Sequence, residues 1–480
     1  MNLIYGVKDR PKTGRLILFA LQQLLAILAA TITVPMVVNA NTGSDMSISA
    51  ALFGAGAGTF VYLLFTQFKS PVFLGSSFAF IGSMTAAMAG AASMSLGYLG
   101  LLIGAGFAGL VYVIIALVVK FVGVKWIDKV MPAAVIGPTV ALIGLSLSGS
   151  AIQNALGGIN LTDGSYVMDL HATLCLICAL FTLAITIVCS VYGKKMLKMI
   201  PFIIGILSGY ALAAIFTGFS YIPGAEAMRI IDFTIFKSMD WVPDFTFVEA
   251  FINADFAESG NIGAYIGTVA VAYIPVAFVV FAEHLADHKN ISSIIESDLL
   301  TDPGLSRTLL GDGVGSIVGA FFGGCPNTTY GESVGCVAIS GNASVLTILV
   351  TAGLAVVFSF IAPFVTFLSS IPGCVMGGVC IALYGFIAVS GLKMVQKVDL
   401  NDNANLFTVS TILVCGVGSM ALTFGKVTIT NIASALILGI LVNVLVNLKK
   451  KKDTPVEGEE EAPAQEIAVE PAKDESVKED

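Results

Sequence analysis

Five ionisable residues stand inside or beside apolar stretches of this chain, where water solvates them poorly. Glu283, His284, Asp287 and His288 end one apolar stretch, and Glu332 lies in another. An ionisable side chain within a bilayer costs roughly 2.5–3.5 kcal/mol on insertion scales, so each residue needs a partner or a purpose. Glu283 and Asp287 are four apart and share one face of a helix. Because ionised carboxylates only accept hydrogen bonds, such acids indicate a site for a ligand rich in N–H donors.

The elements that must position these residues are membrane-spanning helices. The chain has 480 residues, of which 56% are hydrophobic and 12% charged, whereas soluble domains carry about 25% charged residues. This composition excludes a soluble protein. We predict an all-α polytopic membrane protein with about fourteen transmembrane helices, each long enough to cross a hydrocarbon core of about 30 Å. The helices are expected at residues 15–38, 48–67, 71–90, 96–120, 131–149, 169–192, 198–218, 263–288, 305–323, 325–340, 343–369, 372–391, 405–424 and 428–448.

The distribution of basic residues tests this topology independently, because lysine and arginine gather in short cytoplasmic loops. With the N-terminus inside, the outward loops hold only Arg229, Lys237 and Lys426, and the other 21 of the 24 basic residues face the cytoplasm. The asymmetry predicts an even number of spans, with N- and C-termini cytoplasmic. The short loops favour a multi-pass protein of the cell (plasma) membrane.

The two halves of the chain echo each other. Aligning Pro132 with Pro372 also places Gly137 on Gly377. Two halves of seven spans would enter the membrane from opposite sides, as in the inverted repeats (here 7+7) of many secondary transporters. The expected organisation is a cytoplasmic N-terminus (1–14), a first seven-span repeat (15–218), an extracellular connection (219–262), a second seven-span repeat (263–448) and a disordered acidic cytoplasmic tail (449–480).

Two segments interrupt the helical pattern at corresponding places in the halves, residues 70–78 and 325–332. Both mix proline, glycine and small hydroxyl residues with β-branched or aromatic ones. Irregular backbone survives inside a bilayer only where protein or a water-filled cavity satisfies its polar groups. Paired broken spans therefore indicate a substrate site near the middle of a transporter.

Uracil has the donors and acceptors that such a site would suit. Its ring N–H groups can donate to Glu283 and Glu332, which accept. Its carbonyl oxygens can accept from backbone N–H groups at the half-helix starts near Phe78 and Gly331, where the helix dipole is positive.

Stacking and proton transfer complete the predicted site. Tyr330 or Tyr384 could stack on the ring of the base. Burial beside other acids favours the protonated form of a carboxyl, as proton coupling requires. We therefore expect Glu283 to take up the co-transported proton and Asp287 or His288 to pass it on.

Each of these residues also has a purely structural interpretation. Glu283 and Glu332 could be buried acids satisfied by backbone or hydroxyl partners. His288 could face solvent or a helix end. Asp312 could line the site or stand at the cytoplasmic start of its helix. His171 is expected at the membrane interface.

Other features indicate packing rather than chemistry. The glycine-rich run 54–58 lies in an apolar span, where it lets helices approach closely rather than binding phosphate. Cys175 and Cys178 form a CxxC without a second pair, which favours core packing over a metal or redox role. We expect no metal, no cofactor and no nucleic-acid partner, and we find no residue set that would make the protein an enzyme.

Three stretches of the chain carry a family resemblance. Residues 74–80, 281–288 and 311–332, above all the segment NTTYGE at 327–332, resemble the uracil permease branch of the nucleobase–ascorbate transporter (nucleobase:cation symporter-2) family. The resemblance covers residues 5–448. It implies core and gate domains, short antiparallel strands in the broken spans, homodimers in the lipid bilayer and proton symport of uracil. The substrate contacts that it implies are Glu283, Glu332, Phe78, Tyr330, Gly331 and Tyr384.

The chain departs from the family pattern at two positions. Uracil members carry a histidine four residues after the first glutamate, whereas Asp287 stands there and His288 follows, about 100° further round the helix. The family has asparagine directly after the second glutamate, where this chain has Ser333. Purine and xanthine members carry Gln-Asn in place of Glu332 and Ser333, which favours a pyrimidine.

Two other classes of transport protein compete with this interpretation. One is a purine, xanthine or urate permease, including a sodium-coupled one, and uptake assays with competing bases would separate it. The other is a channel or anion exchanger of the related fold, which would favour a basic residue in the site.

Overall fold

The computed structural model describes residues 3–123, 126–159, 161–162, 165–194, 196–252, 262–424 and 427–447, and the predicted tail lies outside these ranges. The described chain is mostly helical. Eight of its helices are long and apolar enough to cross a membrane. A ninth span follows if α14 (Val345–Phe358) and α15 (Ala362–Ser369), which meet at 85°, form one broken span. The prediction of a helical, multi-pass membrane protein is therefore confirmed.

Each of the fourteen predicted segments contains a helix. The eight long spans are α1 (Thr13–Thr42), α2 (Ile48–Phe65), α4 (Met94–Val122), α6 with α7 (Ala133–Ser146 and Ser148–Ala155), α8 (Leu170–Tyr192), α10 (Pro201–Phe219), α11 (Ile262–Ile295) and α16 (Gly373–Val395). The other helices are α3 (Ile81–Ala89), α5 (Ile127–Val130), α9 (Met196–Met199), α12 (Leu305–Gly323), α13 (Gly331–Ser340), α17 (Asn403–Val417) and α18 (Asn431–Asn447). Single turns are η1 (Phe78–Phe80), η2 (Glu226–Met228), η3 (Phe233–Lys237), η4 (Val248–Ile252) and η5 (Leu300–Gly304). The strands are β1 (Leu74–Ser76), β2 (Leu161–Thr162), β3 (Ser165–Tyr166), β4 (Asn327–Thr329), β5 (Leu422–Phe424) and β6 (Val427–Ile429).

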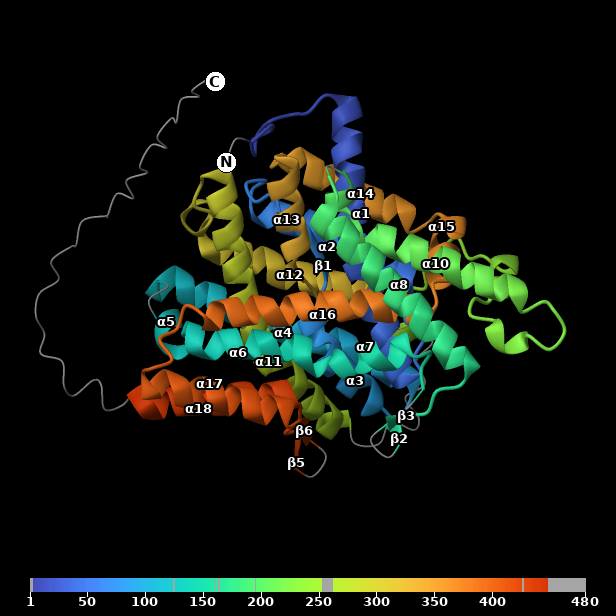
Figure 1. Cartoon of the computed structure of the whole chain (residues 1–480). Helices are drawn as coiled ribbons and strands as arrows, with labels where there is room; N and C mark the ends of the chain where they lie inside the picture. Colours follow the sequence, from blue (N-terminus) through green and yellow to red (C-terminus); the bar gives the residue numbers. More distant parts are fainter. Residues whose placement is uncertain are drawn as a thin grey trace, which may run out of the picture.

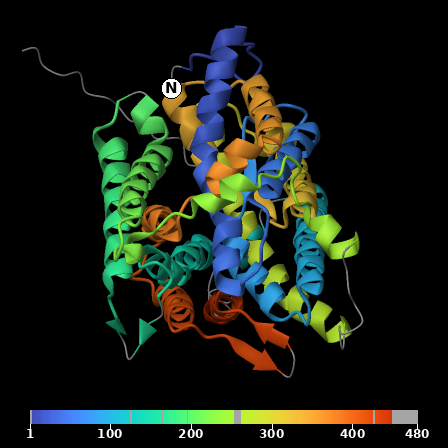
Figure 2. The same ribbon diagram turned by 90° about the vertical axis from the view of Figure 1, so that its right-hand side faces the viewer.

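The helices form two groups, which Figure 1 and Figure 2 show from perpendicular directions. In the first group, α2 packs on α12 and α14, and α4 packs on α11 and α12. In the second group, α16 packs on α6, α7 and α8, and α17 packs on α6 and α18 (Figure 1). Each group combines helices from both halves of the sequence, so residues far apart in the chain meet inside it.

The two predicted broken segments meet inside the first group as a pair of antiparallel strands. β1 and β4 are both buried, and Gly75 stands opposite Thr328. Beyond the ladder, the Ser77 N–H donates to the Pro326 carbonyl at 2.9 Å. η1 with α3, and α13, begin just after the strands end. Two short helices therefore start in the interior of the protein, as the interrupted pattern predicted.

One predicted helix ends early. The helix expected at 405–424 stops at Val417, and β5 pairs with β6 as an antiparallel hairpin. Ser419 has a φ of 54°, which lies outside the right-handed helical region. The residues that follow include β-branched and aromatic types that favour strands. The prediction of one helix over residues 405–424 is therefore wrong beyond Val417, where the apolar residues form a strand instead.

Glycine lets α2 and α12 approach each other closely, as the run 54–58 predicted. A Cβ at Gly54 would lie 2.5 Å from the carbonyl oxygen of Gly319. A Cβ at Gly58 would lie 2.4 Å from Nδ2 of Asn327, which itself donates to the Gly54 carbonyl at 2.9 Å. The close approach of these helices thus anchors β4 on α2.

We predict that Gly54→Ala lowers the melting temperature of the detergent-solubilised protein. Its Cβ would overlap the backbone of Gly319, and relieving the overlap requires α12 to shift, at a cost of roughly 1–3 kcal/mol. Gly106→Ala is the control, because a Cβ at Gly106 in α4 meets nothing within 4 Å. Equal melting temperatures for the two variants would contradict the close packing of α2 on α12.

Candidate functional site

A cavity of about 360 Å³ lies between the two groups of helices. Residues of η1, β4, α11 and α13 line it from the first group, and residues of α6, α9, α10 and α16 line it from the second. Phe78 forms part of its aromatic wall. The acids Glu283, Asp287 and Glu332 line it together with one base, Lys198. The cavity thus combines hydrogen-bond acceptors with aromatic surface.

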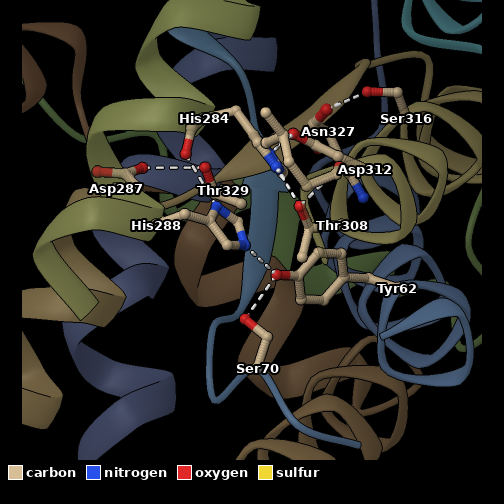
Figure 3. A network of polar contacts seen from close by, with 11 residues as sticks. Tyr62, Ser70, His284, Asp287, His288, Thr308, Asp312, Ser316, Asn327 and Thr329 are labelled. Atoms are coloured by element: carbon tan, nitrogen blue, oxygen red, sulfur yellow. Dashed lines mark hydrogen bonds and ion pairs between the residues drawn. The ribbon is translucent and has the colours of Figure 1, made fainter. Parts of the chain in front are cut away.

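The predicted acids come together from α11 and α13. Asp287, Glu332 and Asp312 are the charged neighbours of Glu283. Glu283 and Glu332 are half-buried at the cavity, whereas Asp287 is 7% exposed and accepts a hydrogen bond from Thr329 Oγ1 at 2.9 Å (Figure 3). The carboxylates of Glu283 and Glu332 are therefore accessible to a ligand, while Asp287 is fixed against β4.

The helix starts at η1 and α13 also reach the cavity, which Phe78 and Gly331 both line. The first N–H groups of a helix have no partner within that helix and carry partial positive charge. A Cβ at Gly331 would stand 3.7 Å from Oδ1 of Asp287. The start of α13 therefore lies beside Asp287 at the cavity.

The two predicted tyrosines support the cavity wall. The Tyr330 ring packs over Gly75, and its hydroxyl donates to the Ser76 carbonyl at 2.8 Å. Tyr330 belongs to the lining, but its ring is held against β1. Tyr384 is buried, is not among the described lining residues, and stands edge-on to Phe78 with ring centroids 5.8 Å apart. Tyr384 therefore acts on the cavity through Phe78.

Ser333, where the chain departs from the family pattern, is fully buried and lies outside the described cavity lining. Its Oγ accepts hydrogen bonds from Gln23 Nε2 at 2.5 Å and from the Phe73 N–H at 3.0 Å. The side chain thus joins α1, the segment before β1 and α13. It positions the start of α13, and with it Glu332.

Sequence reasoning missed a buried pair formed by His284 and Asp312, which Figure 3 shows. His284 Nδ1 is 2.6 Å from Asp312 Oδ2, and His284 Nε2 is 3.0 Å from Thr308 Oγ1. Because the Thr308 hydroxyl donates to the Leu305 carbonyl, it accepts from Nε2–H. The other nitrogen therefore shares one proton with Asp312, and the pair as a whole is neutral.

His288, which was predicted to pass on a proton, is fully buried and lies outside the described cavity lining. Its Nδ1 donates to the His284 carbonyl at 2.8 Å, because a carbonyl can only accept. Its Nε2 is 2.7 Å from the Tyr62 hydroxyl, which is 2.7 Å from Ser70 Oγ (Figure 3). A polar chain thus runs from α11 to the start of the first broken segment.

The remaining candidates lie away from the cavity. His171 is half-buried at the start of α8, with Nδ1 3.2 Å from the Ala227 carbonyl and Nε2 3.6 Å from Cys175 Sγ. Cys175 and Cys178 are buried free thiols. Within the ranges that the structure describes, no group of three or more His, Cys, Asp or Glu residues could hold a metal ion.

A second cavity, of about 520 Å³, lies where α1 ends and α2 begins, and sequence reasoning gave no signal for it. Asp45, Asp240 and Asp244 line it from loops that are distant in the sequence. Burial raises the pKa of Asp244, and repulsion from Asp240, Glu249 and Asp45 raises it further. An acidic surface of this kind repels anions.

A largely apolar cavity that holds three acids, between two groups of membrane-spanning helices and beside two broken spans, is the architecture of a secondary transporter. The chain belongs to a family of permeases, since the model of the Permease family matches residues 14–424. The predicted membership of the nucleobase–ascorbate transporters is thereby confirmed. The protein is a transporter rather than an enzyme.

Relatives with similar sequences are named uracil permeases. That of Bacillus caldolyticus is 37% identical over 447 residues, which are 92% of this chain and 94% of the relative. That of Bacillus subtilis (strain 168) is 36% identical over 456 residues, 93% of this chain and 96% of the relative. That of Escherichia coli (strain K12) is 33% identical over 445 residues, 92% and 94% of the two chains.

Solved structures of similar fold come from other transporters. The transmembrane domain of BicA, a cyanobacterial bicarbonate transporter, superposes with a TM-score of 0.58 at 16% identity, over 90% of this chain and 98% of that one. The murine anion transporter Slc26a9 in its inward-facing state gives a TM-score of 0.60 at 12% identity, over 92% and 69% of the chains. At these identities the likeness concerns the fold alone.

We predict that Ser333→Ala lowers the melting temperature of the purified protein. The change removes the acceptor of the buried Phe73 N–H and leaves Gln23 Nε2 with only the Ser333 carbonyl at 3.4 Å, at a cost of about 1–3 kcal/mol. Ser340→Ala in the same helix removes two part-buried contacts, the 3.5 Å bond to the Val337 carbonyl and the 3.2 Å bond from the Asn342 N–H, and should have a smaller effect. If the two variants melt together, Ser333 does not hold α13 in place.

Proposed function

We propose that the protein imports uracil across the cell membrane by proton symport. The observation that carries the proposal is that Glu283 and Glu332, from different helices, line one cavity beside the start of α13. Two acceptors facing one space suit a planar base with two ring N–H groups. The names of the similar relatives support uracil as that base.

In the proposed complex, the ring N–H groups of uracil donate to the carboxylates of Glu283 and Glu332. Its carbonyl oxygens accept from backbone N–H groups at Phe78 and Gly331, where the helix starts favour negative charge. The Phe78 ring, which Tyr384 supports edge-on, packs on the base. Because the site then pairs donors with acceptors throughout, it rejects rings that lack one of these groups.

Tyr330 contributes to the same complex through its backbone, because its ring packs against β1 and its hydroxyl bonds to the Ser76 carbonyl. Uracil is neutral, so the polar groups around it, rather than a net charge on the ligand, provide selectivity. The lone base of the described lining, Lys198, stands on the opposite helix group from the three acids.

Glu283 takes up the co-transported proton in this proposal, because it faces both the cavity and the other acids. A protonated carboxyl can donate as well as accept, so protonation changes the hydrogen bonds that the ligand can make. Asp287, one turn along the same face of α11, accepts the proton next. His288 carries it onward through Tyr62 and Ser70, whose hydrogen-bonded chain supports this role.

The two groups of helices act as the core and gate domains of an alternating-access transporter. The cavity reaches Lys198, Asn290 and Met394, near helix ends that the positive-inside rule assigns to the cytoplasm, so we infer that this conformation opens inward. The chain would form a 7+7 inverted repeat and a homodimer in the plasma membrane, with both termini cytoplasmic.

Glu283→Gln and Glu332→Gln should each weaken uracil binding by about 10- to 100-fold, because each replaces a charge-assisted acceptor. His171→Ala, far from the cavity, should bind normally. Binding and uptake of radiolabelled uracil, measured at matched expression, check this. Normal uptake by both glutamine variants would remove the proposed site.

Uracil uptake into proteoliposomes should rise with an imposed inward proton gradient and should resist excess xanthine. We expect each uracil to enter with a proton, because Glu283 is protonated when uracil binds. The control replaces the proton gradient by a sodium gradient of equal size. Uptake that follows sodium, or that xanthine blocks, would favour a purine or sodium-coupled permease instead.

A further inference from the structure

Among the described residues, eleven buried side-chain polar atoms have no hydrogen-bond partner, and three of them lie in one region: Oδ1 of Asp312, the hydroxyl of Tyr112 and Oγ1 of Thr328. Asp312 is 0%, Tyr112 1% and Thr328 2% exposed. Burying such an atom without a partner is costly, and native proteins contain few of them. Three in one region therefore call for a common explanation.

The three atoms lie around one place. The Tyr112 ring on α4 stands edge-on to His284, with centroids 6.3 Å apart. Its hydroxyl lies near the Thr328 side chain, and the carboxyl groups of Asp312 and Glu283 are among its neighbours. Thr328 lines the ligand cavity. The three side chains thus connect the ligand cavity, which Thr328 lines, with the His284–Asp312 pair. The proton route proposed above does not use this pair.

We propose that Asp312, Tyr112 and Thr328 hold a buried water molecule that connects the ligand site with the His284–Asp312 pair. A buried water needs about two to four polar partners. A carboxylate oxygen accepts, and each hydroxyl both donates and accepts, so the three atoms satisfy a water and are satisfied by it. No other kind of ligand is needed to complete their hydrogen bonds.

This inference rests on the proposed function, because it gives the co-transported proton a second destination. Glu283 releases its proton to the water, and the water releases one of its own to Oδ1 of Asp312. The water is regenerated, Glu283 becomes negative and the His284–Asp312 pair becomes positive. No bond between heavy atoms changes.

The titratable groups around Tyr112 are few and can be named. α12 contributes Asp312, and α11 contributes Glu283, His284 and Asp287. α3, which also packs on α4, has no titratable residue. η4 brings Glu249 to Tyr98, elsewhere on α4. Removing the Tyr112 hydroxyl therefore alters the surroundings of Glu283 and Asp287 on α11 and of Asp312 on α12.

Tyr112→Phe tests the water site, and Tyr273→Phe is the matched control. Tyr273 is also fully buried and its hydroxyl also has no partner among the described groups. Its ring stacks on Phe80 at 5.4 Å, and no carboxylate is among its electrostatic neighbours. Each variant is measured in proteoliposomes for uracil accumulation driven by an inward proton gradient. Uracil counterflow at equal pH, which needs no net proton movement, is measured beside it.

Tyr112→Phe should lower gradient-driven accumulation about tenfold, as one lost hydrogen bond does, and keep counterflow within about twofold of wild type. Tyr273→Phe should match wild type in both assays. A Tyr112→Phe protein that behaves like Tyr273→Phe overturns the water site. If Tyr112→Phe fails to fold, Thr328→Val decides instead, since it must reduce accumulation more than counterflow.

Failure of the symport proposal gives a different result. Wild-type uptake that ignores the proton gradient refutes symport, and the water site is then judged by the pH profile of uracil binding. Tyr112→Phe must shift that profile relative to both wild type and Tyr273→Phe. Identical profiles for the three proteins overturn the water site.

Discussion

Backbone that leaves the helical conformation inside a membrane must find its hydrogen-bond partners within the protein, and the structure depends on how this is done. β1 and β4 satisfy each other as an antiparallel pair. The pair fits only because Gly54 and Gly58 let α2 come close to α12 and to Asn327, while Gly75 makes room for the Tyr330 ring. The same crossing fixes where η1 and α13 begin, and therefore where the cavity can be.

The crossing also explains how three acids can share one cavity. Carboxylates at such close quarters repel one another, so their charge must be offset by protons, by ligand N–H groups or by positive dipoles. The start of α13 supplies a dipole next to Glu332, and Thr329 donates to Asp287. Glu283 keeps no such fixed donor in the described structure, which leaves it to a proton or a ligand. In the proposed symport, substrate binding and protonation are thereby linked at this one residue.

Local signals in the sequence were enough to predict the broken spans and the acids at the site. Proline and glycine inside apolar stretches, and ionisable residues at the ends of spans, are visible without knowledge of tertiary contacts. Features that depend on such contacts were missed. His284 and Asp312 are 28 residues apart, and nothing in either stretch shows that they touch. Ser333 directly follows Glu332 in the sequence, yet its hydroxyl bonds to Gln23 of α1 and lies outside the described cavity lining.

The rotation of a helix between neighbouring positions explains the remaining departure from the family pattern. Asp287 shares the face of Glu283 and lines the cavity. His288 lies about 100° further round the helix and reaches Tyr62 in the protein interior. A titratable group moved by one position therefore leaves the ligand cavity and joins a buried chain. Asp287 stands where the family pattern has a histidine, and His288 follows one position later, so the proposed symport has different groups to receive a departing proton. Glu283 and Glu332 still line the cavity.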